Sequence, residues 1–514
     1  MPSSLPWPWR SEWGLFVALL VAYNLNVHYT PAFAPANESV RLYATQALVD
    51  HGQLALDPVL AAHGVRNVDK ASYQGRAYLD KAPGASLLAA PVYAVGRLLG
   101  GGAHSGVLHY WLELFTRLLV GLPCALAGLV LRRTVVLLGG SFGAGTFAAL
   151  LVGLASPVAI YATLFFGHGL AAALAMFGYY AAVASPGSSP TSRGPALAAG
   201  AFAGLMVLVE TQTAALAVGL LAALALRRGA RSLLLAGLGA LPFAAAQAIW
   251  NYAIFGNPFE FAYGHKADAT LSAIHATGLF GMGLPSAEAL VGLTFGPHRG
   301  LFFHAPALLL AVFVVLPGVS GAARWAAGLA VLHTLFLAGF KDWPAGDSWA
   351  PRHLLPAVPL LGVAAGLALD RCLGGAGGSE DREAPPLRLG APTRYTLMAL
   401  VGAAFGWGIT AAWLPVVTFP YAPTAFAVPL LELAVPYALA GYHVPGPGLA
   451  VLAVVCGLVA LASRLRWSRL ALVVALALAV GVVAPLLLSR EPDARGQRIR
   501  ARVACLMEYV DCRR

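Results

Sequence analysis

Apolar runs of about 20 residues recur along nearly the whole chain, and they constrain its fold more than any other feature. A helix needs about 20 mostly apolar residues to cross a bilayer, and on this measure the sequence holds about 13 candidate spans, including 13–33 and 158–182. The chain is 59% hydrophobic and 11% charged, whereas a soluble domain is usually about 45–50% apolar and about 25% charged. The sequence therefore predicts an all-α polytopic membrane protein without a large soluble domain.

The distribution of arginine predicts the orientation of these spans. Basic clusters at 132–133 and 227–231 share a side of the membrane with the N-terminus, provided that segment 85–99 does not cross. That segment is apolar but short, and it is interrupted by Pro91, which suits a helix lying in the membrane interface. Because cytoplasmic loops are enriched in Lys and Arg, the arginine-rich side is predicted to be cytoplasmic. The net charge of +11 is thus a topology signal, and we expect no nucleic-acid partner.

Four parts are expected along the chain. Residues 1–371 form the main transmembrane module, with a long outer loop at 34–110 that carries interfacial helices. Residues 372–394 are rich in Gly, Pro and charge, which is typical of a flexible linker, here on the cytoplasmic side. Residues 395–488 supply further transmembrane helices, and 489–514 form a C-terminal tail.

Cysteine usage gives no sign of a metal centre. The five cysteines include no C-x-x-C pair and no ligand spacing, so we expect no zinc site, and no other metal or cofactor is indicated. Cys505 and Cys512 lie close together in the tail, and the sequence leaves open whether they form a disulfide. The first apolar segment lacks a clear small-residue cleavage site, so we expect it to stay as a span.

Acidic, basic and aromatic residues gather in the loops of the predicted outer side, whereas the inner loops carry mostly arginine. Such a mixture on one face indicates a reaction site, the alternative being ordinary solvated loop residues. The candidates are Glu38, just after the first span; Tyr73, Tyr78, Asp80 and Lys81 in "YQGRAYLDKAPG"; Tyr263, His265 and Arg299 in the second outer loop; and Asp347 and Arg352 in the third.

Individual candidates suit particular tasks. The Glu38 carboxylate can reach lipid headgroups and water, although it could equally be an acidic residue stabilised at a helix N-terminus. Asp80 can orient Lys81, whose ammonium suits a lipid-linked phosphate. Arg352 can bind a phosphate bidentately, or it can snorkel to the interface.

Two further ionisable residues lie inside or at the edge of predicted spans. Charged groups are costly in a bilayer and therefore hint at function. Glu210 is expected in an outer turn between two short spans, which lowers this cost. For His168 the structural alternative is a hydrogen bond between helices.

Together these elements resemble the GT-C glycosyltransferases, and most closely the family 39 protein O-mannosyltransferases and bacterial aminoarabinose transferases. In those enzymes an acidic residue just after the first span is the catalytic carboxylate, which matches Glu38, and the lysine of a "KPP"-like element contacts the donor phosphate, which matches Lys81. The segments "YATLFFGHGLAAAL", "NYAIFGNPFEFAYGH", "GPHRGLFFHAP" and "WAPRHLLPAVPLL" are also similar to bacterial relatives, so the resemblance covers most of residues 10–370. The chain departs from the pattern where Asn37 precedes Glu38 in place of an aspartate, and in reading "KAPG".

This resemblance implies an inverting transfer of a sugar from a polyprenyl-phosphate donor to a hydroxyl of a lipid, glycan or protein. The reaction would occur on the outer face of the inner (plasma) membrane. Glu38 would be the base, and Lys81 with Arg352 or Arg299 would neutralise the leaving phosphate. The substrate-binding or orienting residues would be Asp80, Tyr73, Tyr78, His168, Glu210, Tyr263, His265 and Asp347. The competing interpretation is a polytopic transporter or lipid flippase, which would place polar groups near the bilayer midplane and often shows inverted repeats, although the sequence contains no evident internal repeat.

Overall fold

The computed structural model describes residues 8–27, 29, 35–63, 69–100, 108–183, 193–278, 281–375, 389–439 and 497–498. Most of the predicted linker, the predicted spans near 447–463 and 470–488, and the tail with Cys505 and Cys512 lie outside these residues.

The N-terminal half consists of helices and one hairpin. Its elements are α1 (Pro8–Asn26), α2 (Ala36–His51), α3 (Asp57–His63), β1 (Lys70–Tyr73), β2 (Arg76–Leu79), α4 (Gly84–Leu98), α5 (Leu108–Phe115), the π-helical η2 (Thr116–Gly121), α6 (Leu122–Leu137), α7 (Phe142–Leu154), α8 (Val158–Tyr161), α9 (Gly167–Val183), α10 (Arg193–Val209), the 3₁₀ turn η3 (Thr211–Thr213), α11 (Ala214–Arg228) and α12 (Ala230–Phe255).

The named elements of the second half are all helices, joined by loops. Its elements are η4 (Ala262–His265), α13 (Ala269–His275), α14 (Ala287–Thr294), α15 (Leu301–His304), the 3₁₀ helix η5 (Pro306–Val315), α16 (Gly321–Ala338), η6 (Arg352–Ala357), α17 (Val358–Cys372), α18 (Ala391–Val417), the π-helical η7 (Leu430–Ala434) and α19 (Val435–Leu439).

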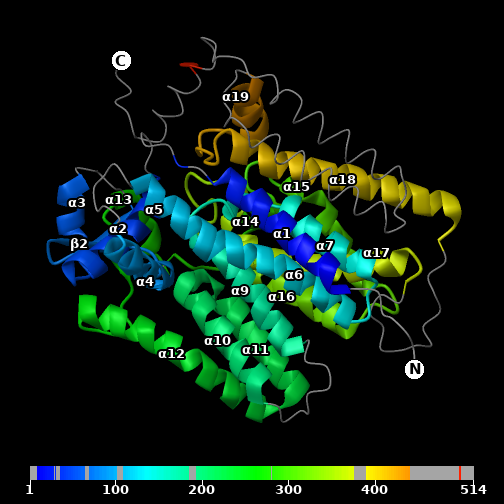
Figure 1. Cartoon of the computed structure of the whole chain (residues 1–514), viewed down its shortest axis with the longest axis horizontal. Helices are drawn as coiled ribbons and strands as arrows, with labels where there is room; N and C mark the ends of the chain where they lie inside the picture. Colours follow the sequence, from blue (N-terminus) through cyan, green and yellow to red (C-terminus); the bar gives the residue numbers. More distant parts are fainter. Residues whose placement is uncertain are drawn as a thin grey trace.

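Five described helical stretches are long and apolar enough to cross a membrane: Leu108–Leu137, Ala230–Phe255, Gly321–Ala338, Arg352–Cys372 and Ala391–Val417. They differ in their surroundings. The apolar window of Arg352–Cys372 is fully buried inside the protein, whereas only 11% of that of α12 is buried. In Figure 1, α12 runs along the edge of the bundle. The predicted all-α polytopic membrane fold is confirmed, while the number of about 13 spans stays a prediction.

The described residues of the predicted first outer loop fold into a compact unit, here called the outer cap. Gln74 and Gly75, both with positive φ, form the two-residue turn that joins β1 and β2, a geometry that matches the twist of antiparallel strands. Figure 1 shows α2, α3, α4 and β2 gathered at one end of the bundle, and α2 packs directly on α3, α4 and β2. At 15 residues, α4 is about 22 Å long, shorter than the hydrocarbon core of about 30 Å, as its predicted interfacial position requires.

One predicted span is interrupted. A continuous helix was expected over 158–182, but α8 ends at Tyr161 and α9 begins only at Gly167. The hydropathy pattern does not reveal this break, because the intervening residues are themselves apolar. Gly167 is required there, since a Cβ atom at this position would lie 2.3 Å from Glu210 Oε1. The break leaves main-chain amides free of helical hydrogen bonds next to the polar site.

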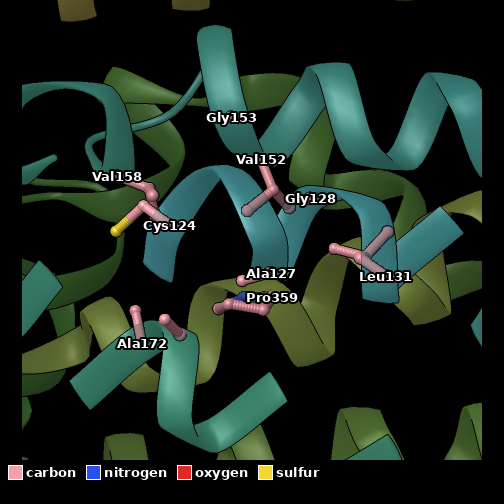
Figure 2. A pocket seen from close by; sticks show the side chains of 10 residues that line it. Cys124, Ala127, Gly128, Leu131, Val152, Gly153, Val158, Ala172 and Pro359 are labelled. Atoms are coloured by element: carbon pink, nitrogen blue, oxygen red, sulfur yellow. The ribbon is translucent and has the colours of Figure 1, made fainter. Parts of the chain in front are cut away.

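A small apolar pocket lies inside the bundle, away from the charged residues. Cys124, Gly128 and Leu131 of α6 line it, with Val152 of α7 and Pro359 of α17 (Figure 2). No charged side chain contributes to its wall. The pocket is therefore no part of the polar site described next.

Candidate active site

Glu38 is a fully buried carboxylate at the centre of the candidate site. It lies in the first turn of α2 and has no exposed surface. Its Oε1 accepts a short hydrogen bond from the phenol of Tyr29 and a second from the backbone N–H of Phe165 at 3.0 Å, and its Oε2 accepts one from the phenol of Tyr421 at 2.6 Å. Burial raises the pKa of Glu38 to about 7, although these hydrogen bonds and Arg41 act in the opposite direction. Near neutral pH this carboxylate can therefore both take up and release a proton.

The break between α8 and α9 links Glu38 to Arg352. Phe165 in this break donates its N–H to Glu38, and the ring of its neighbour Phe166 lies 5.5 Å from the guanidinium carbon of Arg352. The Nε of Arg352 is buried, and no acceptor among the described residues binds it. Because buried polar groups normally have a partner, an unsatisfied guanidinium beside an aromatic ring is suited to receive an anion.

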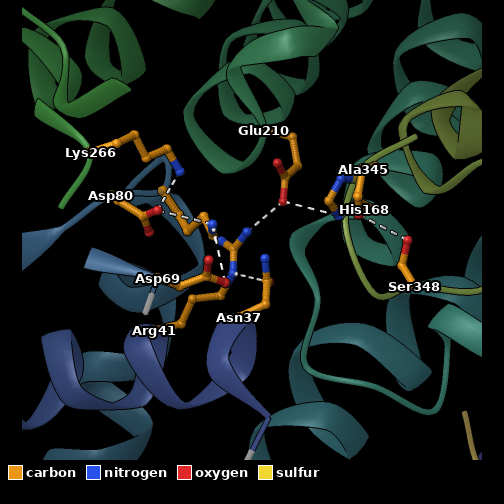
Figure 3. Close-up of polar contacts among 10 residues, drawn as sticks. Asn37, Arg41, Asp69, Asp80, His168, Glu210, Lys266, Ala345 and Ser348 are labelled. Carbon is orange, nitrogen blue, oxygen red and sulfur yellow. Dashed lines mark hydrogen bonds and ion pairs between the residues drawn. The ribbon is translucent and has the colours of Figure 1, made fainter. Parts of the chain in front are cut away.

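Arg41 and Glu210 form the centre of a buried polar network. The Nη2 of Arg41 lies 2.6 Å from Glu210 Oε1, and both side chains are almost fully buried. Glu210 Oε1 lies 3.4 Å from His168 Nδ1 (Figure 3). On the other side of the ring, His168 Nε2 lies 3.1 Å from His353 Nδ1. The interhelical hydrogen bond expected for His168 is thus present. Since Arg41 follows Glu38 by three residues on α2, this network fixes the helix that carries Glu38.

Two lysines share one aspartate on the other side of Arg41 (Figure 3). The ammonium of Lys266 contacts Asp80 Oδ2, Lys81 Nζ lies 3.1 Å from the same oxygen, and Lys81 also lies 3.3 Å from Asp69. Burial alone would raise the pKa of Asp80, but the two ammonium groups outweigh it and hold the pKa below its usual value. Asp80 therefore stays ionised and orients Lys81, as the sequence predicted.

Tyr263 and Asp342 lie between these clusters. Burial raises the pKa of Tyr263 to about 12, with Glu210 as the next cause, and Arg41, Asp80 and Lys81 also act on its phenol. Burial raises the pKa of Asp342 above its usual value, although Arg352, His275, Lys266 and Lys81 act in the opposite direction. Lys81 and Arg352, far apart in sequence, therefore lie close enough to act on the same carboxylate. The phosphate-binding candidates Lys81 and Arg352 thus converge on one polar region.

Arg299, from the predicted second outer loop, hydrogen-bonds to the backbone of the predicted third outer loop, residues 341–353. Its guanidinium donates to the backbone carbonyls of Pro344 and Gly346, both at 2.5 Å, and to that of Ser348. This loop contains Ala345 and Ala350 with positive φ, which is strained for residues other than glycine and persists only when the surroundings hold it. The geometry favours a loop-supporting role for Arg299 over a phosphate contact. Asp347 in the same loop accepts a hydrogen bond from Thr424 N at 3.1 Å.

The remaining candidates lie in the outer cap. Tyr73 and Phe255 pack around the ring of His265, with ring centroids 5.0 and 4.9 Å from it, and Glu260 Oε1 lies 2.6 Å from His265 Nε2. Tyr78 is buried in the cap's hydrophobic core. In the described part of the chain, none of these three candidates hydrogen-bonds to Glu38, whose partners are Tyr29, Phe165 and Tyr421.

Several residues of the site were not among the sequence candidates, including Tyr29, Arg41, Lys266, His353 and Tyr421. A signal existed for Arg41, because a charge three residues after a suspected catalytic carboxylate on one helix shares its face. Tyr421 had none, since it is separated from Glu38 by 383 residues. Among the described residues, no group of three or more His, Cys, Asp or Glu side chains could hold a metal ion.

The fold is similar to that of a solved membrane protein. The crystal structure of ArnT from Cupriavidus metallidurans bound to undecaprenyl phosphate matches with a TM-score of 0.52 and 18% sequence identity, over 96% of this chain and 79% of that one. The two proteins therefore share a fold, that of an all-α polytopic membrane protein. The apo state of the same ArnT matches with a TM-score of 0.45 and 19% identity, over the same shares of both chains. No protein-family model and no curated protein matches the sequence.

Proposed function

We propose that this protein is a membrane glycosyltransferase that uses a polyprenyl-phosphate-linked sugar as donor. The observation that carries the proposal is Glu38, a fully buried carboxylate with its pKa raised to about 7, which the α8–α9 break links to Arg352 and its unsatisfied Nε. The similarity of the fold to ArnT, whose crystal structure holds undecaprenyl phosphate, supports the choice of donor. The family 39 assignment suggested by the sequence belongs to the same proposal.

Glu38 acts as the general base in this proposal. An acceptor hydroxyl attacks the anomeric carbon of the sugar from the face opposite the phosphate, and its proton passes to Glu38. The bond between the anomeric carbon and the phosphate oxygen breaks, and its electron pair stays on the phosphate, which leaves as polyprenyl phosphate. This single displacement inverts the anomeric configuration. A base with a pKa near the working pH is well suited to such a proton transfer.

Lys81 and Arg352 neutralise the leaving phosphate. Lys81 is held by Asp80 and Asp69 with 12% of its side chain exposed, so its ammonium keeps access to the polar region. The planar guanidinium of Arg352 can bind two phosphate oxygens. Stabilising charge where it develops is commonly the largest single contribution to catalysis. In this proposal residues 1–371 form the catalytic module, with its site on the extracytoplasmic side of the inner membrane, and residues 395–488 are C-terminal transmembrane helices.

The direct test is donor consumption. The purified full chain, reconstituted in lipid nanodiscs, is incubated with a panel of undecaprenyl-phosphate sugars and mixed acceptors, and release of undecaprenyl phosphate is followed by mass spectrometry. At least one donor should be consumed by the wild type, and consumption should fall strongly in Lys81→Ala. A panel left intact by the wild type would contradict the proposal, as would Lys81→Ala acting at the wild-type rate.

A further inference from the structure

Residues 418–429, between α18 and η7, are here called the outer strap. This segment contacts Glu38 through the phenol of Tyr421. Tyr421 and Phe426 on the strap are buried, with 5% of each exposed. The indole N–H of Trp349 donates to Phe419 O at 2.9 Å, and Thr424 N donates to Asp347 Oδ1 at 3.1 Å. The third outer loop therefore holds the strap in place through two hydrogen bonds at separate points.

The outer strap supplies the hydrogen-bond donor for Oε2 of Glu38, whereas other parts of the chain supply the donors for Oε1. Oε1 is occupied by Tyr29 and by the amide of Phe165, which belong to the connection after α1 and the α8–α9 break. Oε2 receives its donor from Tyr421 at 2.6 Å, a distance typical of a charge-assisted O–H···O⁻ bond. To act as the base, Glu38 must accept a hydrogen bond, and then the proton, from the hydroxyl of the acceptor. In this structure the phenol of Tyr421 occupies the position at Oε2 where that hydroxyl would bind.

We propose that the acceptor hydroxyl binds at Oε2 of Glu38 by displacing the phenol of Tyr421, so that the acceptor subsite lies beneath the outer strap. The proposal rests on the proposed role of Glu38 as base. Exchanging one hydroxyl for another keeps the hydrogen-bond count of a buried carboxylate constant, which avoids the cost of leaving it unpaired. Tyr421 is a positioning residue here: it shields Glu38 from water until an acceptor arrives.

The test measures access to Glu38 with no sugar substrate. Dicyclohexylcarbodiimide, which reacts with protonated carboxyl groups in membranes, is added to the reconstituted full chain between pH 5.5 and 8.5, and the adduct on the Glu38 peptide is quantified by mass spectrometry. The limiting rate at low pH reports access, and the midpoint of the pH dependence reports the pKa of Glu38. Variants Tyr421→Phe and Tyr421→Ala are compared with the wild type. Tyr179→Phe is the matched control, because it removes a buried phenol on α9 that donates a hydrogen bond to Ala322 O on α16.

In Tyr421→Ala the limiting rate should rise by about 10-fold or more, because the protonated carboxyl loses both a hydrogen-bond partner and the ring that shields it. In Tyr421→Phe the midpoint should move to higher pH, because the phenol stabilises the carboxylate. Tyr179→Phe should change neither quantity. Wild-type access and an unmoved midpoint in both Tyr421 variants would overturn the proposal.

Exogenous phenol then tests whether Oε2 accepts a hydroxyl from a separate molecule. A cavity left by a large-to-small substitution can bind a small aromatic molecule. In Tyr421→Ala, added phenol should restore the protection of Glu38 from the reagent. Benzene, which has the ring but no hydroxyl, should restore much less protection. Equal protection by both would show that the site recognises the ring alone and would contradict an acceptor hydroxyl at Oε2. A strap that behaves as proposed in a protein that consumes no donor would instead refute the glycosyltransferase function.

Discussion

Arg41 and Glu210 form an ion pair of 2.6 Å across 169 residues of chain, with 0% and 4% of their side chains exposed. The pair joins α2, which carries Glu38, to the turn between α10 and α11. A buried ion pair does not always stabilise a protein relative to apolar residues, but removing one partner leaves an uncompensated charge. This pair therefore couples the position of the proposed base to the integrity of the bundle.

Replacing Arg41 alone should strongly destabilise the protein. In Arg41→Met the buried Glu210 carboxylate loses its cationic partner, and the expected loss is about 3–5 kcal/mol. The double variant Arg41→Met/Glu210→Gln removes both charges and should recover much of that loss. The measurement is the midpoint of thermal unfolding in detergent micelles. Arg76→Met serves as control, because the exposed Arg76–Asp57 pair is worth only about 0–1 kcal/mol. A double variant less stable than Arg41→Met would contradict this role of the pair.

The raised pKa of Glu38 predicts opposite effects of pH on activity and stability. A base must be deprotonated, so kcat/KM should rise through pH about 7 and then level off. Between about 4.5 and about 7 the folded protein keeps a proton that the unfolded chain has released, so the free energy of unfolding should fall as pH rises. The difference between wild type and Glu38→Gln isolates this contribution. A wild-type rate that is independent of pH between 5.5 and 8 would argue against Glu38 as the base.

Lys81 and Lys266 both contact Asp80, but we expect Lys81 to bind the donor phosphate and Lys266 to stabilise the fold. Lys81→Ala should weaken binding of undecaprenyl phosphate by roughly 10–100-fold, the worth of one hydrogen bond to a charged group. Lys266→Met should mainly lower the thermal midpoint, since Lys266 is the more buried of the two and Asp80 depends on it. Binding isotherms and thermal unfolding measured on both variants decide this. A Lys81→Ala protein that binds undecaprenyl phosphate like the wild type would remove Lys81 from the phosphate site.

The sequence predicted what depends on local pattern and little of what depends on distant contacts. Apolar runs predicted the helical membrane fold, and the position of Glu38 after the first span marked it as a candidate. The pairing of Asp80 with Lys81 was also predictable, because the residues are adjacent. The break before Gly167 was not, since the apolar segment continues through it, and no local pattern connects Tyr421 or Lys266 to the site. Arg299 has the residue type expected of a phosphate ligand, but its guanidinium is committed to three backbone carbonyls.

The most direct test of the account is the kinetic effect of Glu38→Gln. Glutamine keeps the size of the side chain and can still hydrogen-bond to its neighbours, but it cannot take the acceptor's proton. With a donor identified, kcat should fall by roughly 10²–10⁴-fold while donor binding changes little, because the carboxylate acts on the acceptor. The thermal midpoint of the variant must show that it is folded. A folded Glu38→Gln protein that turns over near the wild-type rate would contradict the central claim, and the base would have to be sought elsewhere.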